Sequence, residues 1–458
     1  MCGNFLGRSG EIMNLKSIGI VVALILIMFM SAIETSIVSL ALPTIKHNFN
    51  AGGLASLVFA VYFIAIVIAN PIVGEALDRL KISYITIFGL LLFSIGSLFS
   101  GLSGSFSMLI ISRFVQGLGA GVMMALSQIV PKLAFEIPLR YKIMGTVGSV
   151  WGISSIVGSL LGGTILQFLS WHWLFFINLP IAAIAIILVL LTFHFKNETN
   201  ASKTDRKLDV KGMTVFYIMI FAFLFAVMNK EHLILNLFSI IITIIIGYIL
   251  YRYEKSLNKP FIPVTEFNKT IVVIFATDFI YAMILMGYNI YMPVYLQEQL
   301  HLSPLQSGFV VFPISIAWLI LNFSLDKLEL KFSRRGLYLF AFTLLIVCGV
   351  LILLVKEIPL FIAFSLLLAG VSFGTVYTKD SVITQEETSP QHMKRMMSLY
   401  TLTKSLGSSI GSTVMGYVYY LSLSFVKFNI YNVIMLTFVL LIALVILWLV
   451  TQHKESMR

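Results

Sequence analysis

The chain has 458 residues, of which 59% are hydrophobic and only 11% are charged, whereas about 25% of the residues in a soluble globular domain are charged. This composition excludes a protein made mainly of soluble domains and favours one with many membrane spans. The net charge of +11 is not gathered on a basic folded domain, which excludes a nucleic-acid-binding module, and two cysteines are too few for a disulfide framework.

Runs of about 20 apolar residues recur along the chain, and each is long enough to cross a hydrocarbon core of about 30 Å. We therefore expect an all-α membrane protein with fourteen transmembrane helices. Only a short polar turn at 229–232 separates the seventh span from the eighth, and only a short turn at 356–358 separates the eleventh from the twelfth. The expected spans cover residues 18–42, 54–74, 84–102, 108–130, 143–168, 174–194, 213–229, 233–251, 271–295, 306–325, 337–355, 359–378, 396–420 and 430–450.

The distribution of Lys and Arg supports this number of spans. With both termini in the cytoplasm, 25 of the 31 Lys and Arg residues fall in inward-facing segments and four in outward-facing ones. Inward-facing segments of membrane proteins are rich in these residues, and a miscounted span would invert every later loop and remove the asymmetry. Topology and contact with anionic lipid then explain the positive net charge.

Five ionisable residues lie in or beside the apolar runs: Glu34, Arg113, Asp278, Lys404 and Asp380. An ionised side chain on a spanning helix costs about 2.5 to 3.5 kcal/mol on insertion scales, so it is retained where it has a partner or a function. Two acids and two bases within spans indicate a polar interior pathway and hence a transporter. Asp380 falls at the end of its run and is expected in the loop, whereas Lys404 either snorkels to the cytoplasmic surface or has a function.

The fourth expected span carries a motif around its arginine. Arg113 and Gln116 lie three residues apart and share one helix face, while Gly117 lets a neighbouring backbone come close. A guanidinium that is always charged needs carbonyl or carboxylate acceptors in this setting. The alternative is an Arg that snorkels to the outer interface.

Small residues line one face of the fifth expected span, because they recur at steps of three and four. They are Gly145, Gly148, Ser149, Gly152, Ser155, Gly158, Ser159, Gly162 and Gly163. Packing alone would explain a short stripe of this kind, but the length of this one suggests two helices that slide or seal. After the second span, Gly74 is followed by Asp78 and Arg79, a candidate charge lock on the cytoplasmic side.

These motifs resemble the signatures of the major facilitator superfamily, and the small-residue stripe resembles the antiporter motif of its drug-exporting branch. Four longer stretches are similar to the fourteen-span drug:proton antiporters, the bacterial multidrug, quinolone and tetracycline exporters that include staphylococcal-type pumps. They are Ser31–Pro43, Trp171–Pro180, Tyr291–Gln297 and Ser303–Gly308. The family usually has Asp in place of Glu34 and proline in place of Ser159.

The resemblance implies a major facilitator fold, with six-helix bundles at 1–195 and 259–458 and a linker with two extra central helices at 196–258. It also implies a proton-driven antiporter that exports amphipathic or cationic drugs, dyes and quinolones from a Gram-positive cell by alternating access. A narrower exporter of tetracycline or of a physiological metabolite remains an alternative. A membrane enzyme would need a catalytic constellation, and a channel would need repeated filter elements; neither is visible in the sequence.

Glu34 and Asp278 are the candidate proton carriers, and both are also candidate drug ligands. An apolar setting penalises the charged form of a carboxyl group, so such a group can load and release a proton as access alternates. The resemblance makes their spans, the first and the ninth, equivalent elements of two repeats. Arg113 is expected to tune the proton site. The alternatives are a permanent Glu34–Arg113 pair and a purely structural contact of Asp278.

A promiscuous drug site needs flat, polarisable surfaces. Most aromatic side chains of the spans are expected to pack or to face lipid, and the candidates for the cavity are Tyr62, Trp151, Tyr281, Tyr288 and Asn289. The sequence shows no metal-ligand cluster, nucleophile–base pair or phosphate-binding loop. The expected partners are therefore drugs, protons and membrane lipid, without nucleic acid, metal or another cofactor, and the chain is expected to act as a monomer.

Overall fold

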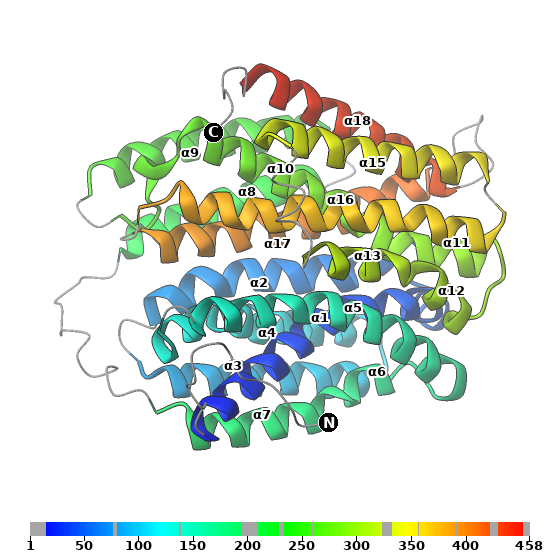
Figure 1. Ribbon diagram of the computed structural model, residues 1–458, viewed down its shortest axis with the longest axis horizontal. Helices are drawn as coiled ribbons and strands as arrows, with labels where there is room; N and C mark the ends of the chain where they lie inside the picture. The colour runs from blue at the N-terminus through cyan, green and yellow to red at the C-terminus, as the bar shows by residue number, and fades with distance from the viewer. Residues whose placement is uncertain are drawn as a thin grey trace.

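The computed structural model describes residues 15–76, 80–136, 139–194, 209–228, 233–257, 260–322, 332–355, 357–389, 392–421 and 429–451. All the regular elements in these ranges are helical, and the long helices run side by side along one axis of the molecule (Figure 1). The elements of the first part are α1 (Leu15–Asn48), η1 (Gly52–Ser56), α2 (Leu57–Ala76), α3 (Ile82–Gly101), α4 (Phe106–Ala134), α5 (Leu139–Phe168), α6 (Trp173–Phe176), α7 (Asn178–Thr192), α8 (Val210–Met228) and α9 (Leu233–Lys255). Those of the second part are η2 (Val264–Glu266), α10 (Lys269–Met286), η3 (Gly287–Tyr291), α11 (Met292–Glu298), α12 (Pro304–Val311), α13 (Pro313–Asn322), α15 (Arg334–Leu354), α16 (Pro359–Glu386), α17 (Met393–Tyr419) and α18 (Asn429–Thr451).

Each of the fourteen expected spans corresponds to a helix or to a pair or trio of consecutive helices. In the described part of the chain, 13 stretches are long and apolar enough to cross a membrane. Four of these join consecutive elements, namely η1 with α2, α6 with α7, α10 with η3 and α11, and α12 with α13. The remaining expected span, 396–420, is α17. The prediction of an all-α membrane protein is therefore confirmed.

Helix α17 is less apolar than the other spans because protein, and not lipid, surrounds much of it. It packs between α10 and α2. A Cβ at Gly407 would collide with the carbonyl oxygen of Phe279, and one at Gly411 would lie 2.5 Å from the Cα of Met283, both on α10. Small residues permit such close approach of two helices within a membrane. The Thr401 and Ser405 hydroxyls donate back to main-chain carbonyls of their own helix, which satisfies them without water.

The helices form two groups that meet along two seams. In Figure 1, α1–α7 occupy the lower part and α15–α18 the upper part. Helix α2 packs against α17 at the first seam, and α5 packs against α12 and α13 at the second. We call these groups, α1–α7 and α10–α18, the N-terminal and C-terminal halves. The expected boundaries at 195 and 258 lie outside the described residues, so they stay predictions.

The two extra helices, α8 and α9, form a hairpin beside the first seam. Helix α8 contacts α17, and the Tyr217 hydroxyl donates to the carbonyl oxygen of Ile68 on α2 at 2.8 Å. Helix α9 is nearly bare, with only 6% of its apolar window buried, which is what a lipid-facing helix requires. At its end, Glu254 accepts a hydrogen bond from the backbone N–H of Ile262 at 3.2 Å.

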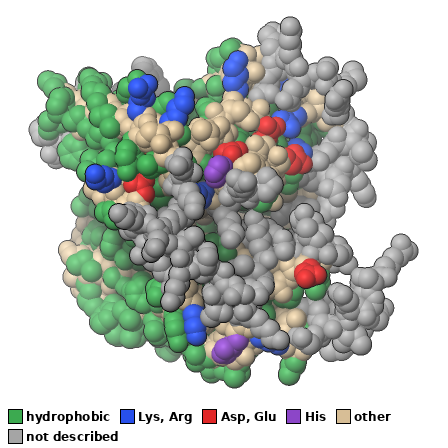
Figure 2. Space-filling model, turned by 90° about the vertical axis from the view of Figure 1, so that its left-hand side faces the viewer, with side chains coloured by type: hydrophobic (Ala, Val, Ile, Leu, Met, Phe, Trp, Pro, Cys, Tyr) green, Lys and Arg blue, Asp and Glu red, His purple; other side chains and the backbone are tan. Residues whose placement is uncertain are grey.

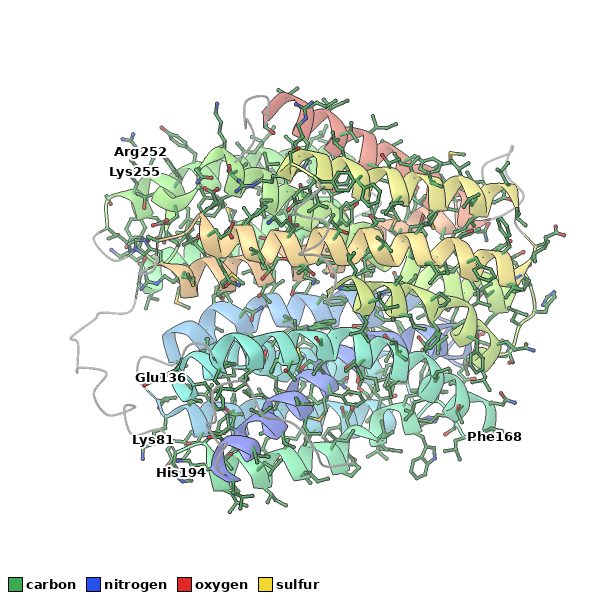
Figure 3. The ribbon with its side chains drawn as sticks, viewed as in Figure 1. Lys81, Glu136, Phe168, His194, Arg252 and Lys255 are labelled. Atoms are coloured by element: carbon green, nitrogen blue, oxygen red, sulfur yellow. The ribbon has the colours of Figure 1, made fainter. Side chains whose placement is uncertain are left out.

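The ends of the helices agree with the expected topology. Lys81, Glu136, Arg252 and Lys255 belong to segments expected in the cytoplasm, and His194 ends the sixth expected span on that side. Figure 3 places all five at the same end of the molecule. Phe168, at the end of α5, lies at the opposite end, as an outward-facing residue should. Charged side chains gather on the cytoplasmic end, and apolar side chains cover the side of the molecule at the left of the view (Figure 2).

At the outer end, polar side chains join the two halves. The Lys46 ammonium on α1 lies 2.8 Å from the Glu298 carboxylate on α11 and 3.0 Å from the Tyr420 hydroxyl. The Gln297 amide donates to the main-chain carbonyl of Leu40 at 3.2 Å. The Lys46–Glu298 pair is about one-quarter exposed, so water weakens its attraction and a modest change in conformation can separate the two charges.

The small-residue stripe of α5 lies where the sequence pattern suggested, between helices that must approach closely. A Cβ at Gly158 would lie 2.8 Å from the Ser36 side chain, and one at Gly162 would lie 3.1 Å from the Cα of Ile37, both on α1. On the other side, a Cβ at Gly163 would lie 2.7 Å from the Cα of Leu305 on α12. The stripe therefore packs α5 against its own half and against the opposite half.

We predict that Gly163→Leu lowers the melting temperature of the purified protein, because the added side chain would overlap the α12 backbone. Overpacking of this kind costs about 1 to 3 kcal/mol. Gly247→Leu on α9 is the matched control, since the nearest atom to a Cβ there is the Met219 sulfur at 3.4 Å. Equal melting temperatures for both variants would contradict the close approach of α5 and α12.

Candidate functional site

A fully buried polar network fills the centre of the N-terminal half. Arg113 on α4 and Glu34 on α1 form an ion pair, with 2.5 Å between Nη1 and Oε1 and no exposure of either side chain. The same Nη1 donates to the Gln116 carbonyl oxygen at 2.6 Å, and the Gln116 amide donates to the Ser97 hydroxyl on α3 at 2.7 Å. Asn178 on α7 donates to the second oxygen of Glu34 at 3.0 Å. Four helices therefore contribute side chains to one carboxylate and its counter-ion.

The guanidinium of Arg113 also contacts two groups on α2. Its Nε donates to the main-chain carbonyl of Val58 on α2 at 3.2 Å, and its Cζ lies 4.3 Å from the centroid of the Tyr62 ring, a cation–π distance. Nη2 has no acceptor among the described residues, and neither the Tyr62 hydroxyl nor the Asn178 carbonyl oxygen has a partner there. Arg113 therefore does not snorkel to the outer interface, and its site retains unused hydrogen-bonding capacity.

The glycines after Arg113 bring α4 against its neighbours. A Cβ at Gly117 would collide with the main-chain carbonyl of Tyr62 on α2, and one at Gly121 would lie 2.8 Å from the Cβ of Ala69. The expected close approach of a neighbouring backbone is therefore confirmed. Its effect is to place the Arg113 side chain over the Tyr62 ring and within reach of the Val58 carbonyl.

The C-terminal half contains two buried carboxylates, and here one expectation was wrong. Asp380 does not lie in a loop: α16 continues past the apolar run to Glu386, and Asp380 is fully buried. The reason is a hydrogen bond from the Tyr338 hydroxyl on α15 to the Asp380 carboxylate, which stabilises the acid inside the bundle. Asp278 on α10 is also fully buried.

Asp278 differs from Glu34 in having no hydrogen-bond donor. The Tyr400 hydroxyl lies beside it but donates to the main-chain carbonyl of Tyr377 at 3.3 Å. Both oxygens of Asp278, and one oxygen of Asp380, therefore lack a hydrogen-bond partner among the described residues. The two carboxylates and the Lys404 ammonium lie close enough for their charges to interact.

Lys404 is partly buried on α17 and does not extend to the cytoplasmic surface. Its ammonium lies 3.8 Å from the centroid of the Tyr377 ring, 5.5 Å from that of Trp151 and 5.9 Å from that of Trp318. Trp151 belongs to α5 in the N-terminal half, whereas Trp318 and Tyr377 belong to α13 and α16 in the C-terminal half. The Lys404 side chain therefore extends from α17 to aromatic rings of both halves.

The other candidate cavity residues are distributed unevenly. Tyr281 is fully buried inside the C-terminal half, where its hydroxyl lies 3.0 Å from that of Ser372. Tyr288 is also buried, and its hydroxyl has no partner among the described residues. Asn289 is partly buried in the π-helix η3, a kind of element that is frequent at functional sites. Of the expected cavity residues, Trp151 contacts Lys404 of the opposite half, and η3, which carries Tyr288 and Asn289, packs against α1 of the opposite half.

The remaining motif residues are placed less completely. Asp78 and Arg79 lie outside the described residues, so the expected charge lock stays a prediction. Gly74 and Gly148 lie within α2 and α5, but their surroundings are not described. Gly152 on α5 faces Leu319 on α13, with 3.3 Å between an added Cβ and the Leu319 side chain.

Several members of the site were missed by reasoning from the sequence. Asn178 and Ser97 complete the network around Glu34, and Tyr338 stabilises Asp380, but none carries a distinctive spacing. A signal was available for Asn178, which is an uncharged polar residue at the start of an apolar run within the Trp171–Pro180 stretch. Ser97 and Tyr338 could be found only from the way distant helices pack.

Comparison with known proteins gives consistent results. A family model described as the Major Facilitator Superfamily matches residues 24–412. The chain is 60% identical over 444 residues to the multidrug efflux pump SdrM of Staphylococcus aureus, which covers 97% of this chain and 99% of that protein. It is 26% identical over 411 residues to the multidrug transporter protein MdtP of Bacillus subtilis, covering 87% and 74% of the two chains.

A solved structure shares the fold at low sequence identity. The peptide transporter POT, crystallised with alafosfalin, superposes with a TM-score of 0.70 at 15% identity, covering 98% of this chain and 97% of that one. At this identity the likeness concerns the arrangement of helices alone.

The buried ion pair gives a prediction about stability. Arg113→Met should lower the free energy of unfolding in mixed detergent micelles by about 3 to 5 kcal/mol, because it leaves the Glu34 charge buried without its partner. Adding Glu34→Gln should restore a large part of that loss. Arg334→Met is the control, since Arg334 and Glu387 are about one-quarter exposed and such pairs contribute about 0 to 1 kcal/mol. Additive losses in the double variant would contradict the pairing.

Proposed function

Because the chain belongs to the major facilitator superfamily, we propose that it is a multidrug efflux pump driven by proton influx, with Glu34 and Asp278 as its proton sites. It is a multi-pass membrane transporter and not an enzyme. Its substrates are amphipathic and cationic drugs and dyes, a proposal supported by the name of the S. aureus relative and by the interior aromatic residues.

The single observation that carries the proton role is the buried Glu34–Arg113 pair. A counter-ion inside the same network lets the Glu34 carboxylate exist without water, and a proton can replace that counter-ion when the helices move apart. Arg113 keeps its charge throughout, and its unused Nη2 donor gives it capacity for another acceptor when Glu34 is protonated. Arg113 thus tunes the proton site and does not bind the drug.

Asp278 supports the second proton site in a different way. A buried carboxylate without a hydrogen bond is costly in its charged form, and Asp278 has no donor on either oxygen among the described residues. A proton removes that cost. Asp278 is therefore suited to carry a proton, whereas the charged form of Glu34 is supported by Arg113 and Asn178.

We predict that Glu34→Gln abolishes proton-driven export from liposomes, because the amide keeps the shape and polarity of the side chain but cannot carry a proton. Purified protein would be tested with an imposed pH gradient and a cationic dye. Glu136→Gln is the matched control, since Glu136 is exposed at the cytoplasmic end (Figure 3) and should export normally. Glu34→Asp should keep partial activity. Export at the wild-type rate by Glu34→Gln would remove Glu34 from the coupling mechanism.

A second prediction concerns the number of protons moved per drug. If Asp278 carries a proton, Asp278→Asn should lower that number and slow export of every substrate alike. The ratio can be measured from the pH gradient that just balances a known drug gradient, first with a monovalent dye and then with a zwitterionic quinolone. Loss confined to the cationic dye would instead make Asp278 a drug ligand, and an unchanged ratio with normal rates would make it structural.

A further inference from the structure

The Lys404 ammonium lies among aromatic rings, as a bound organic cation would, and not in a structural ion pair. Three rings, Trp151, Trp318 and Tyr377, surround its ammonium at 3.8 to 5.9 Å, and we call them the aromatic box. The Trp318 and Tyr377 rings are stacked, with 5.2 Å between centroids and 14° between planes. They belong to the C-terminal half, whereas Trp151 on α5 belongs to the N-terminal half.

Several aromatic rings around one point form a binding site for organic cations. Aromatic faces attract a cation within about 6 Å of the ring centroid, and cages of this kind recognise quaternary ammonium groups and methylated lysine. Among the described residues, the Lys404 ammonium has the three rings but no hydrogen-bond acceptor and no ion-pair partner within 4.0 Å. The Lys404 ammonium is therefore placed by ring contacts and not by an ion pair with a neighbouring side chain.

The surroundings of the box offer Lys404 a second position. Asp278 and Asp380 are both buried, and their charges act on its ammonium. Three of their four carboxylate oxygens lack a hydrogen-bond partner among the described residues. Lysine has a flexible four-carbon stem, so its ammonium can leave the rings and donate to these oxygens.

From these observations we propose that Lys404 is a tethered competitor for the cation subsite of the pump. Its ammonium occupies the aromatic box when no drug is bound, and a monovalent organic cation binds by taking that place while Lys404 moves to the carboxylates. This inference rests on the proposed function and specifies where the cationic group of a substrate binds. Because Trp151 and the other two rings belong to opposite halves, the bound cation would contact both halves at once.

The test is equilibrium binding to the purified full-length protein without a pH gradient. The probes are tetraphenylphosphonium, a monovalent cation, and tetraphenylborate, an anion of nearly the same size and shape. Trp151 and Trp318 lie in the box, so quenching of their fluorescence reports occupancy. Lys404→Met should bind tetraphenylphosphonium about tenfold more tightly than the wild type, because displacing a cation–π contact of about 1 to 2 kcal/mol is no longer required. Tetraphenylborate should gain nothing.

Matched variants separate competition from a general change in the cavity. Lys404→Arg keeps a cation in the box and should bind tetraphenylphosphonium with close to wild-type affinity. Tyr377→Phe keeps the ring and should behave similarly, since the Tyr377 hydroxyl has no partner among the described residues. Tyr377→Leu should weaken binding in both the wild-type and the Lys404→Met backgrounds. If Lys404→Met does not fold, Lys404→Gln carries the same expectation.

The outcomes distinguish this inference from the proposed function. Unchanged or weaker tetraphenylphosphonium binding by a folded Lys404→Met or Lys404→Gln variant would overturn the tethered competitor, even if the wild type exports drugs. Tighter binding of the cation alone, lost again with Tyr377→Leu, would support it. If Lys404→Met binds the cation more tightly than the wild type but a pH gradient drives no export by the wild type in liposomes, the proposed function fails and the assignment of Lys404 stands.

Discussion

The rest of the N-terminal half depends on the need to satisfy one buried guanidinium. Arg113 cannot lose its charge, and no water is available in the hydrocarbon core, so its partners must be other groups of the protein. Glu34, Gln116 and the Val58 carbonyl meet this need from α1, α4 and α2, and Gly117 permits the close approach that brings α2 within reach. The ion pair is therefore as much a constraint on helix packing as a component of transport.

The two halves accommodate their buried charged side chains in different ways. In the N-terminal half, one acid and one base are paired directly and every helix around them contributes a polar group or a ring. In the C-terminal half, two acids share the field of one base that lies among aromatic rings, and most of the carboxylate oxygens have no donor. In the first arrangement both oxygens of the Glu34 carboxylate have a donor. In the second, three of the four carboxylate oxygens have none among the described residues. A substrate group meets less competition from protein contacts in the second.

Reasoning from the sequence succeeded where the signal was local. Twenty-residue apolar runs and the inward bias of Lys and Arg predicted the spans and their topology, and even α17 was found despite its many Ser, Thr and Gly residues. The spacing of Arg113, Gln116 and Gly117 predicted a shared face and a close neighbour. It could not predict that Asn178 and Ser97 would join them, because those contacts depend on helix rotation. The prediction that Asp380 lies in a loop was wrong for a similar reason. The apolar run ends before Asp380, but the hydroxyl that stabilises it inside the bundle belongs to Tyr338, 42 positions away.

The hairpin of α8 and α9 has a consequence for the route by which membrane-dissolved molecules reach the interior. It lies beside the α2–α17 seam and is attached to α2 through Tyr217, so lipid on that side meets the hairpin before it meets the seam. No comparable pair of helices lies against the α5–α13 seam among the described elements. The two flanks of the molecule therefore differ within the plane of the bilayer. An amphipathic molecule that diffuses laterally meets the hairpin on one flank and the α5–α13 seam directly on the other.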